Sequence, residues 1–200
     1  MKKKREVFLK KLKAYGIKEN IPNVSETNGC FLHFLVRSLQ AKTVLEIGMA
    51  NGYSTIYLAD GVENIDGRVV CYEIAETGWR AAEKNFKEVG LSDRIEIRKI
   101  SVLKEPPRKE EKFDFIFVDA QKSLYHEFWK VVKLHMHKNT VVVFDDVLKF
   151  TKKTAPFHAL MKQETEFEQV ILPMDGDDGV MLVRKRVRIR KQQDDHTRGK

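Results

Sequence analysis

The segment VLEIGMANGYS, residues 44–54, constrains the fold of this chain more than any other part of the sequence. It reads as a short apolar strand with an acidic residue near its end, followed by a Gly-x-x-x-Gly turn at Gly48 and Gly52 and a helix from about Tyr53. Glycines at this spacing let the backbone turn sharply at the carboxyl end of a parallel strand and approach a ligand closely. The N–H groups of the next helix face the same crevice, so the segment predicts a ligand site at the turn.

A second acidic residue, Glu73, ends the next predicted strand and lies 21 residues after Gly52. A carboxylate at about this distance from a glycine loop can accept hydrogen bonds from both hydroxyls of a ribose. The turn has neither the Lys-Ser/Thr pair of a phosphate loop nor a Gly-x-Gly-x-x-Gly pattern. Because Glu46 also precedes the turn, the pocket should be acidic, which favours a cationic nucleoside over a pyrophosphate.

From Thr43 onward, predicted strands and helices alternate, and the strands are almost continuously apolar. The predicted strands are TVLEIG, RVVCYE, RIEIRKI, FDFIFVDA, TVVVFDD, FEQVILP and VMLVRKR. This pattern predicts an α/β fold of the Rossmann-like, doubly wound kind, with helices on both faces of the sheet, including helices at Glu76–Val89 and Ser123–Met136. The tight turn before the last strand predicts antiparallel pairing, so we expect seven strands, mostly parallel with one antiparallel strand near the C-terminus.

The length of 200 residues suits one domain with a full core. We predict a single domain over residues 1–186, whose residues 1–42 supply N-terminal helices and a covering loop, and a basic, flexible tail over residues 187–200. The chain has a net charge of +8, yet residues 1–18 alone carry +7 and residues 184–200 carry +6. The rest of the chain is therefore mildly acidic, and the basic ends could bind nucleic acid or simply be solvated.

The sequence also predicts where the protein is located. No apolar run approaches the roughly 18 residues of a membrane span, and the basic N-terminus lacks the apolar stretch of a signal peptide. Cys30 and Cys71 are far apart in apolar surroundings, so we interpret both as buried, free thiols. These features predict a cytoplasmic protein that does not bind a membrane.

Acidic residues end two further predicted strands, since Asp119 follows one and Asp145 and Asp146 follow another. If these strands are neighbours, three carboxylates converge at one edge of the crevice. Such oxygen donors, with no Cys or His nearby, favour Mg²⁺, with Ca²⁺ or Mn²⁺ as alternatives, over zinc. The competing interpretation is that these acids form caps and loops, as we expect for Asp177 and Asp178 in the last turn, although that loop could also border a substrate site.

Five ordered motifs resemble the class I S-adenosylmethionine-dependent, metal-dependent O-methyltransferases, a family that includes catechol and caffeoyl-CoA O-methyltransferases and small prokaryotic enzymes. They are VLEIGMANGYSTIYLA, YEI, FDFIFVDAQKSLY, VVVFDDVL and LPMDGDDGVMLVRK. The resemblance implies S-adenosylmethionine and a divalent cation as cofactors. The implied cofactor contacts are Glu46, Gly48, Gly52 and Ser54 around the methionine part, Glu73 on the ribose, Ile74 and Ser101 beside the adenine, and Asp119. The loop IPNVSETNG resembles the segment that closes over the cofactor.

The resemblance further implies that Asp119, Asp145 and Asp146 hold the metal, and that Lys122 beside Asp119 is the general base. This sequence has Asp146 where the family usually has Asn. A third carboxylate should make the site more negative, which tightens the metal but weakens its pull on a substrate oxygen. The chain before the glycine turn is short, so the lid over the substrate is expected to be reduced or supplied by a partner subunit in a homodimer.

We therefore predict transfer of a methyl group from S-adenosylmethionine to a hydroxyl of a metal-chelated, catechol-like small molecule. Two alternatives stay open. One is methylation of a hydroxylated nucleoside of transfer RNA, which would be held by the basic ends, and the other is a non-catalytic nucleotide- or RNA-binding protein on the same fold. The glycine spacing and Glu46 disfavour an NAD-dependent dehydrogenase.

Overall fold

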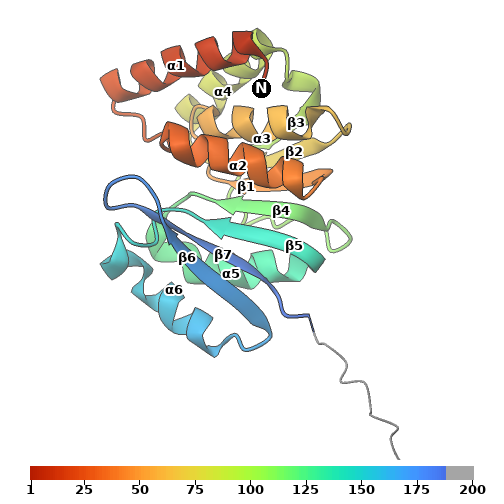
Figure 1. Ribbon diagram of the computed structural model, residues 1–200, viewed down its shortest axis with the longest axis vertical. Helices are drawn as coiled ribbons and strands as arrows, with labels where there is room; N and C mark the ends of the chain where they lie inside the picture. Colours follow the sequence, from red (N-terminus) through yellow and green to blue (C-terminus); the bar gives the residue numbers. More distant parts are fainter. Residues whose placement is uncertain (188–200) are drawn as a thin grey trace, which may run out of the picture.

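The computed structural model describes residues 1–187, and these residues form a seven-stranded sheet with helices on both faces (Figure 1). The predicted tail over residues 187–200 lies almost entirely outside the described residues. The helices are α1 (Lys3–Lys18), α2 (Glu26–Ser38), α3 (Tyr53–Glu63), α4 (Glu76–Val89), α5 (Tyr125–Val132) and α6 (Thr151–Gln163). The strands are β1 (Thr43–Ile47), β2 (Arg68–Tyr72), β3 (Ile95–Arg98), β4 (Phe113–Val118), β5 (Met136–Phe144), β6 (Phe167–Pro173) and β7 (Gly179–Lys185).

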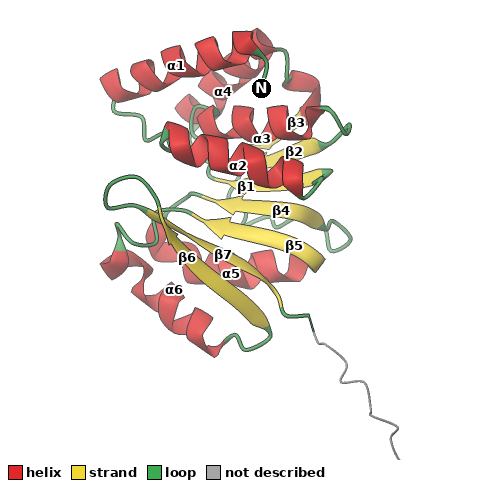
Figure 2. Cartoon of the chain, in the orientation of Figure 1, coloured by secondary structure: helices red, strands yellow, loops and turns green. Residues whose placement is uncertain are grey.

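The strand order is β3-β2-β1-β4-β5-β7-β6, which confirms the predicted doubly wound sheet (Figure 2). Strands β1 to β5 pair in parallel, whereas β7 runs antiparallel to both of its neighbours, β5 and β6. The order reverses between β1 and β4, and a crevice beyond the carboxyl ends of these strands is where such sheets bind ligands.

Alternate residues of the strands β1, β2, β4, β5 and β7 enter two separate cores, as the period of a strand requires. Val44 packs into the core beneath α1, α2, α3 and α4, whereas its neighbour Leu45 packs into the core beneath α5 and α6. The second core is rich in aromatic rings, with Trp129, Phe144 and Phe157 fully buried. Helices therefore cover both faces of the sheet, as predicted. No helix within residues 1–187 is long and apolar enough to cross a membrane.

Two predictions from the sequence are wrong in detail. The helix predicted over Ser123–Met136 ends at Val132, and Met136 instead begins β5, where it pairs with Phe113 on β4 and is buried. The thiol of Cys30 is exposed rather than buried, because it lies on a face of α2 that the core does not cover, whereas Cys71 on β2 is buried as predicted.

Candidate active site

The turn between β1 and α3 requires glycine at two positions. Gly48 and Gly52 have φ values of 89° and 83°, in the left-handed region that side chains disfavour. A Cβ at Gly48 would lie 2.4 Å from the carbonyl oxygen of Asp119, and one at Gly52 would lie 2.4 Å from the Phe86 ring. Both glycines are therefore needed, and the turn lies directly against the end of β4.

Glu73, at the end of β2, holds this turn from the other side. One carboxylate oxygen accepts hydrogen bonds from the backbone N–H groups of Met49 and Ala50, at 3.2 and 2.9 Å, and the other accepts from Ala75 N at 2.8 Å. The side chain also lines a cavity beyond the strand ends. Its oxygens keep lone pairs that can accept hydrogen bonds from a ligand.

Glu46 lies beneath the cavity and is completely buried. Its two oxygens accept hydrogen bonds from Ser54 Oγ at 2.6 Å and Thr55 Oγ1 at 2.5 Å, and Cys71 Sγ lies 3.3 Å away. Burial raises the pKa of Glu46 to about 7 against the opposing effect of these hydrogen bonds. Glu46 does not itself line the cavity, but it holds Ser54, which does. Its contact with the cofactor stays a prediction.

Two predicted adenine neighbours, Ile74 and Ser101, are not among the residues that line the cavity. Ile74 follows Glu73 and its side chain is 73% exposed, which leaves apolar surface that an adenine ring could cover. Ser101 is half-buried, and its hydroxyl accepts a hydrogen bond from Leu103 N at 3.3 Å. Their contact with a cofactor stays a prediction.

The three predicted carboxylates come together at the ends of β4 and β5. Asp119, Asp145 and Asp146 each offer an oxygen, and these atoms lie within 4.8 Å of one another. Burial raises the pKa of Asp119 and Asp145 above the ordinary value, and neighbouring carboxylate charge adds to the effect. Hard oxygen donors with too little positive charge around them fit a divalent cation such as Mg²⁺.

Lys122 supplies a positive charge at this cluster. Its ammonium contacts Asp119, lies 3.1 Å from Asp146 Oδ2 and donates to Tyr125 Oη at 3.0 Å. Burial opposes the charged form, but the surrounding negative charges outweigh it and raise the pKa of Lys122. Tyr125 is fully buried beneath the site and its hydroxyl contacts the carbonyl oxygens of Val118 and Asp145, at 3.1 and 2.9 Å. The hydroxyl of Tyr125 therefore helps to fix the position of the Lys122 ammonium.

Asp178 is a fourth carboxylate beside this cluster, and our main interpretation of the sequence gave it only a role in the last turn. It lines the cavity and accepts a hydrogen bond from Gly179 N at 2.6 Å. Burial, followed by the nearby Asp146 carboxylate, raises its pKa to about 6. The sequence shows the acidic turn DGDDG, but not that it lies near Asp146. That proximity depends on the pairing of β7, which follows the turn, with β5.

One cavity of about 920 Å³, a size typical of small-molecule sites, is lined by Gly48, Ser54, Glu73, Lys122 and the carboxylates of Asp119, Asp145, Asp146 and Asp178. Its floor is the glycine turn and the acidic cluster. The segment Pro22–Ser25, which precedes α2, lines it together with Lys13 of α1. Lys149, Phe150 and Lys153, around the start of α6, line another part. The cavity therefore combines a nucleoside-type turn, a candidate metal site and a covering segment.

The chain is similar in sequence and fold to known proteins. A model of the O-methyltransferase family matches residues 2–186. A catechol O-methyltransferase from Niastella koreensis is 31% identical over 170 residues, covering 77% of this chain and 76% of that enzyme. Caffeoyl-CoA O-methyltransferase 5 from Nicotiana tabacum is 27% identical over 154 residues, covering 74% of this chain and 64% of that enzyme. An O-methyltransferase from Bacillus cereus, solved in complex with SAH, matches with a TM-score of 0.80 and 30% identity over 90% of this chain and 91% of the other.

Proposed function

The chain belongs to the family of S-adenosylmethionine-dependent O-methyltransferases, and we propose that it methylates a hydroxyl of a catechol-like acceptor that a divalent cation chelates. The observation that carries the proposal is the single cavity bounded by Gly48, Glu73, Lys122 and the three clustered carboxylates. The named enzymes that it resembles act on catechol or caffeoyl-CoA, which supports an acceptor with neighbouring hydroxyls.

The cofactor half of the cavity fits S-adenosylmethionine. The glycine turn permits close approach of the ligand, Glu73 can accept hydrogen bonds from the ribose hydroxyls, and Ser54 is held at the wall by Glu46. The acidic surroundings also suit a sulfonium cation. Support comes from the Bacillus cereus relative, whose structure was solved in complex with SAH.

The other half of the cavity would hold the acceptor and the metal. Asp119, Asp145 and Asp146 would bind Mg²⁺, or else Ca²⁺ or Mn²⁺, because hard carboxylate oxygens are the donors these cations prefer. When bound, such a cation lowers the pKa of a hydroxyl and fixes its angle of approach. Transfer is an in-line displacement, so the acceptor oxygen must lie opposite the sulfur.

Lys122 is positioned to take the proton of the acceptor hydroxyl. In the structure its ammonium is held by Asp119 and Asp146, which favour the charged form. It can act as a base only when the negative charge of these carboxylates is compensated by a bound cation. Tyr125 fixes the direction of the lysine toward the cavity.

A direct test is isothermal titration of the purified protein with S-adenosylhomocysteine and, separately, with NAD. We expect saturable binding of S-adenosylhomocysteine and none of NAD. A screen with labelled S-adenosylmethionine against catechols and bulk transfer RNA then identifies the acceptor. Binding of NAD alone, or absence of transfer to every vicinal diol despite cofactor binding, would contradict the proposal.

Transfer RNA is the second candidate acceptor, and one observation favours it. Exposed Lys149 and Lys153 flank Phe150 at the cavity, with their ammonium groups 5.9 and 5.2 Å from the centre of the ring. Basic and aromatic side chains together can bind a phosphate backbone and stack a base. Against it, Arg184 of the basic C-terminal end is already paired with Glu168. If RNA is the acceptor, its affinity should fall steeply with rising salt.

A further inference from the structure

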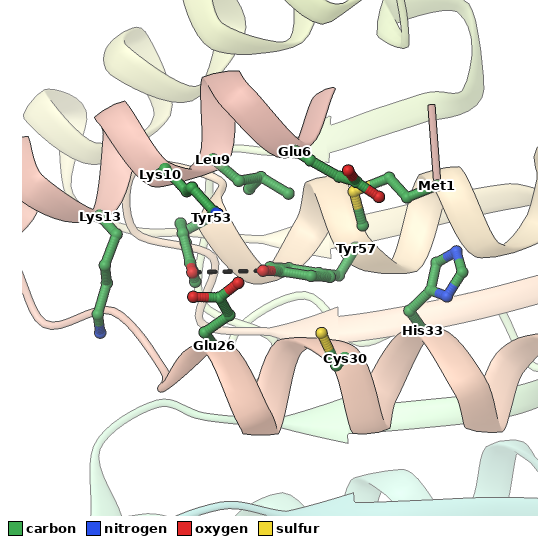
Figure 3. Close-up of a pocket in the computed structure, with 10 residues that line it drawn as sticks. All are labelled: Met1, Glu6, Leu9, Lys10, Lys13, Glu26, Cys30, His33, Tyr53 and Tyr57. Carbon is green, nitrogen blue, oxygen red and sulfur yellow. Dashed lines mark hydrogen bonds between the residues drawn. The ribbon is translucent and has the colours of Figure 1, made fainter. Parts of the chain in front are cut away.

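Lys13 connects α1 to the segment Pro22–Ser25 that lines the large cavity. Its ammonium donates hydrogen bonds to the carbonyl oxygens of Asn23 and Val24, at 2.8 and 2.7 Å. The same side chain also lines a second cavity of about 390 Å³ between α1, α2 and α3, where it extends from α1 toward the chain that enters α2 (Figure 3). Lys13 therefore stands between the two cavities.

Among the described residues, the backbone carbonyl groups of this segment have few other hydrogen-bond donors. It is irregular, and buried carbonyl groups without a partner cost free energy. Val24 itself is buried, and the hydrogen bonds made by the described residues give its carbonyl and that of Asn23 one donor, the Lys13 ammonium. Hydrogen bonds from a charged donor are stronger than neutral ones. A single side chain thus fixes two consecutive peptide groups above the cavity.

Gly16, less than one turn further along α1, allows this close fit. A Cβ at Gly16 would lie 2.3 Å from Asn23 Nδ2, and the Gly16 carbonyl accepts a hydrogen bond from Ile21 N at 2.8 Å. The segment is therefore packed tightly against α1 as well as hydrogen-bonded to it.

Lys13 also lies close to Tyr53, the residue that follows the glycine turn. Its ammonium lies 5.6 Å from the centre of the Tyr53 ring, within range of a cation–π interaction. Tyr53 begins α3 directly after Gly52. One charged group thus joins the covering segment to the start of the helix at the cofactor turn.

We infer that Lys13 is a positioning residue that holds the segment Pro22–Ser25 in place over bound S-adenosylmethionine. The inference rests on the proposed function for the identity of the ligand. If the segment is already ordered in the free protein, binding does not carry the entropic cost of ordering it, and the affinity is higher. Lys13 acts through the segment and lies apart from the acidic cluster, so its loss should weaken cofactor affinity without slowing the chemical step.

The test compares the wild type with Lys13→Met, Lys13→Arg and the control Lys10→Met, which removes an exposed charge from the same helix and the smaller cavity only. Titration with S-adenosylhomocysteine should show affinity about tenfold weaker for Lys13→Met, as expected for two lost charged hydrogen bonds that are partly replaced by water. KM for S-adenosylmethionine should rise in parallel while kcat at saturation stays within about twofold. Lys13→Arg should restore most of the affinity, and Lys10→Met should match the wild type.

Hydrogen exchange of the free protein separates this inference from the proposed function, because it needs no ligand. The amides of Ile21, Asn28 and Gly29, which donate hydrogen bonds to Gly16 and Ser25 at the two ends of the segment, should exchange faster in Lys13→Met, whereas those of β4 should not change. Unchanged exchange and unchanged affinity in Lys13→Met would overturn the inference. A wild type that does not bind S-adenosylhomocysteine would instead contradict the proposed function. If Lys13→Met does not fold, Lys13→Gln replaces it, because the shorter, neutral side chain also lacks the charged donor to the Asn23 and Val24 carbonyls, and undiminished affinity there would overturn the inference.

Discussion

The amide of Asn28 donates a hydrogen bond to Asp145 Oδ1 at 2.8 Å, although 117 positions separate the two residues in the chain. Both side chains are buried. Asn28 lies in the first turn of α2, and its backbone N–H is capped by Ser25, which ends the covering segment. The bond therefore fixes one oxygen of a candidate metal ligand and links that ligand to the segment over the cofactor.

We predict that Asn28→Leu weakens metal binding. Without the amide, Asp145 loses the donor that orients it, and loss of such an outer partner costs about 10–100-fold in metal affinity. Titration with Mn²⁺ measures the effect, and Asn85→Leu is the control because its amide donates to a backbone carbonyl, that of Asn51. Equal Mn²⁺ affinity in the Asn28 variant and the wild type would refute the role.

Glu73→Ala should weaken binding of S-adenosylhomocysteine about 10–100-fold, because two charged hydrogen bonds to the ribose are lost. The turn should also loosen, since Met49 N and Ala50 N lose their acceptor. Glu76→Ala is the matched control, because within residues 1–187 that exposed carboxylate pairs with Arg80 alone. Affinity in Glu73→Ala equal to that of the control would show that Glu73 does not bind the cofactor.

Lys122→Met should lower kcat by about 10²–10⁴-fold, the usual contribution of a general base, while cofactor affinity stays unchanged. Tyr125→Phe should have a smaller effect, because it removes only the hydroxyl that braces the lysine. Steady-state rates at saturating substrates measure both. A Lys122→Met enzyme with the kcat of the wild type would mean that the proton leaves by another route.

The ion pairs of Arg5 should matter for stability rather than for catalysis. Arg5 is buried and bonds Asp60 and Glu63 at 2.7 Å, which attaches α1 to α3. Removing the arginine partner of the buried Asp60 carboxylate should lower the free energy of unfolding by about 3–5 kcal/mol in Arg5→Met. The control, Arg94→Met, removes an exposed pair with Asp66 and should cost less than about 1 kcal/mol. Urea denaturation at neutral pH distinguishes the two.

The same cluster predicts a dependence on pH. Burial opposes ionisation of Asp60, but hydrogen bonds from His33 and Arg5 prevail and lower its pKa to about 2. A carboxylate with a lowered pKa stabilises the fold above its unfolded value near 4 and loses that contribution as the pH falls toward 2. The stability advantage of the wild type over Arg5→Met should therefore shrink between pH 4 and pH 2. A constant difference across this range would rule out the assignment.

Much of the fold could be predicted because its signals are local. The strands are short apolar runs that the sequence shows directly, and β6 and α4 begin and end where the sequence predicted. Met136 could not be assigned to β5 in the same way, because its strand conformation depends on pairing with Phe113. The carboxylates were found because each ends a strand. Asn28 and Lys13 were missed because their partners are fixed by packing across the molecule, which no short pattern records.

One assay tests most directly whether this cavity supports metal-dependent methyl transfer. Transfer from labelled S-adenosylmethionine to catechol is followed in Mg²⁺, in excess chelator, and in chelator with Mg²⁺ restored, for the wild type and for Asp145→Ala. We expect chelator to abolish transfer, Mg²⁺ to restore it, and Asp145→Ala to be folded but nearly inactive under all three conditions. Full activity of the wild type in excess chelator would contradict the account.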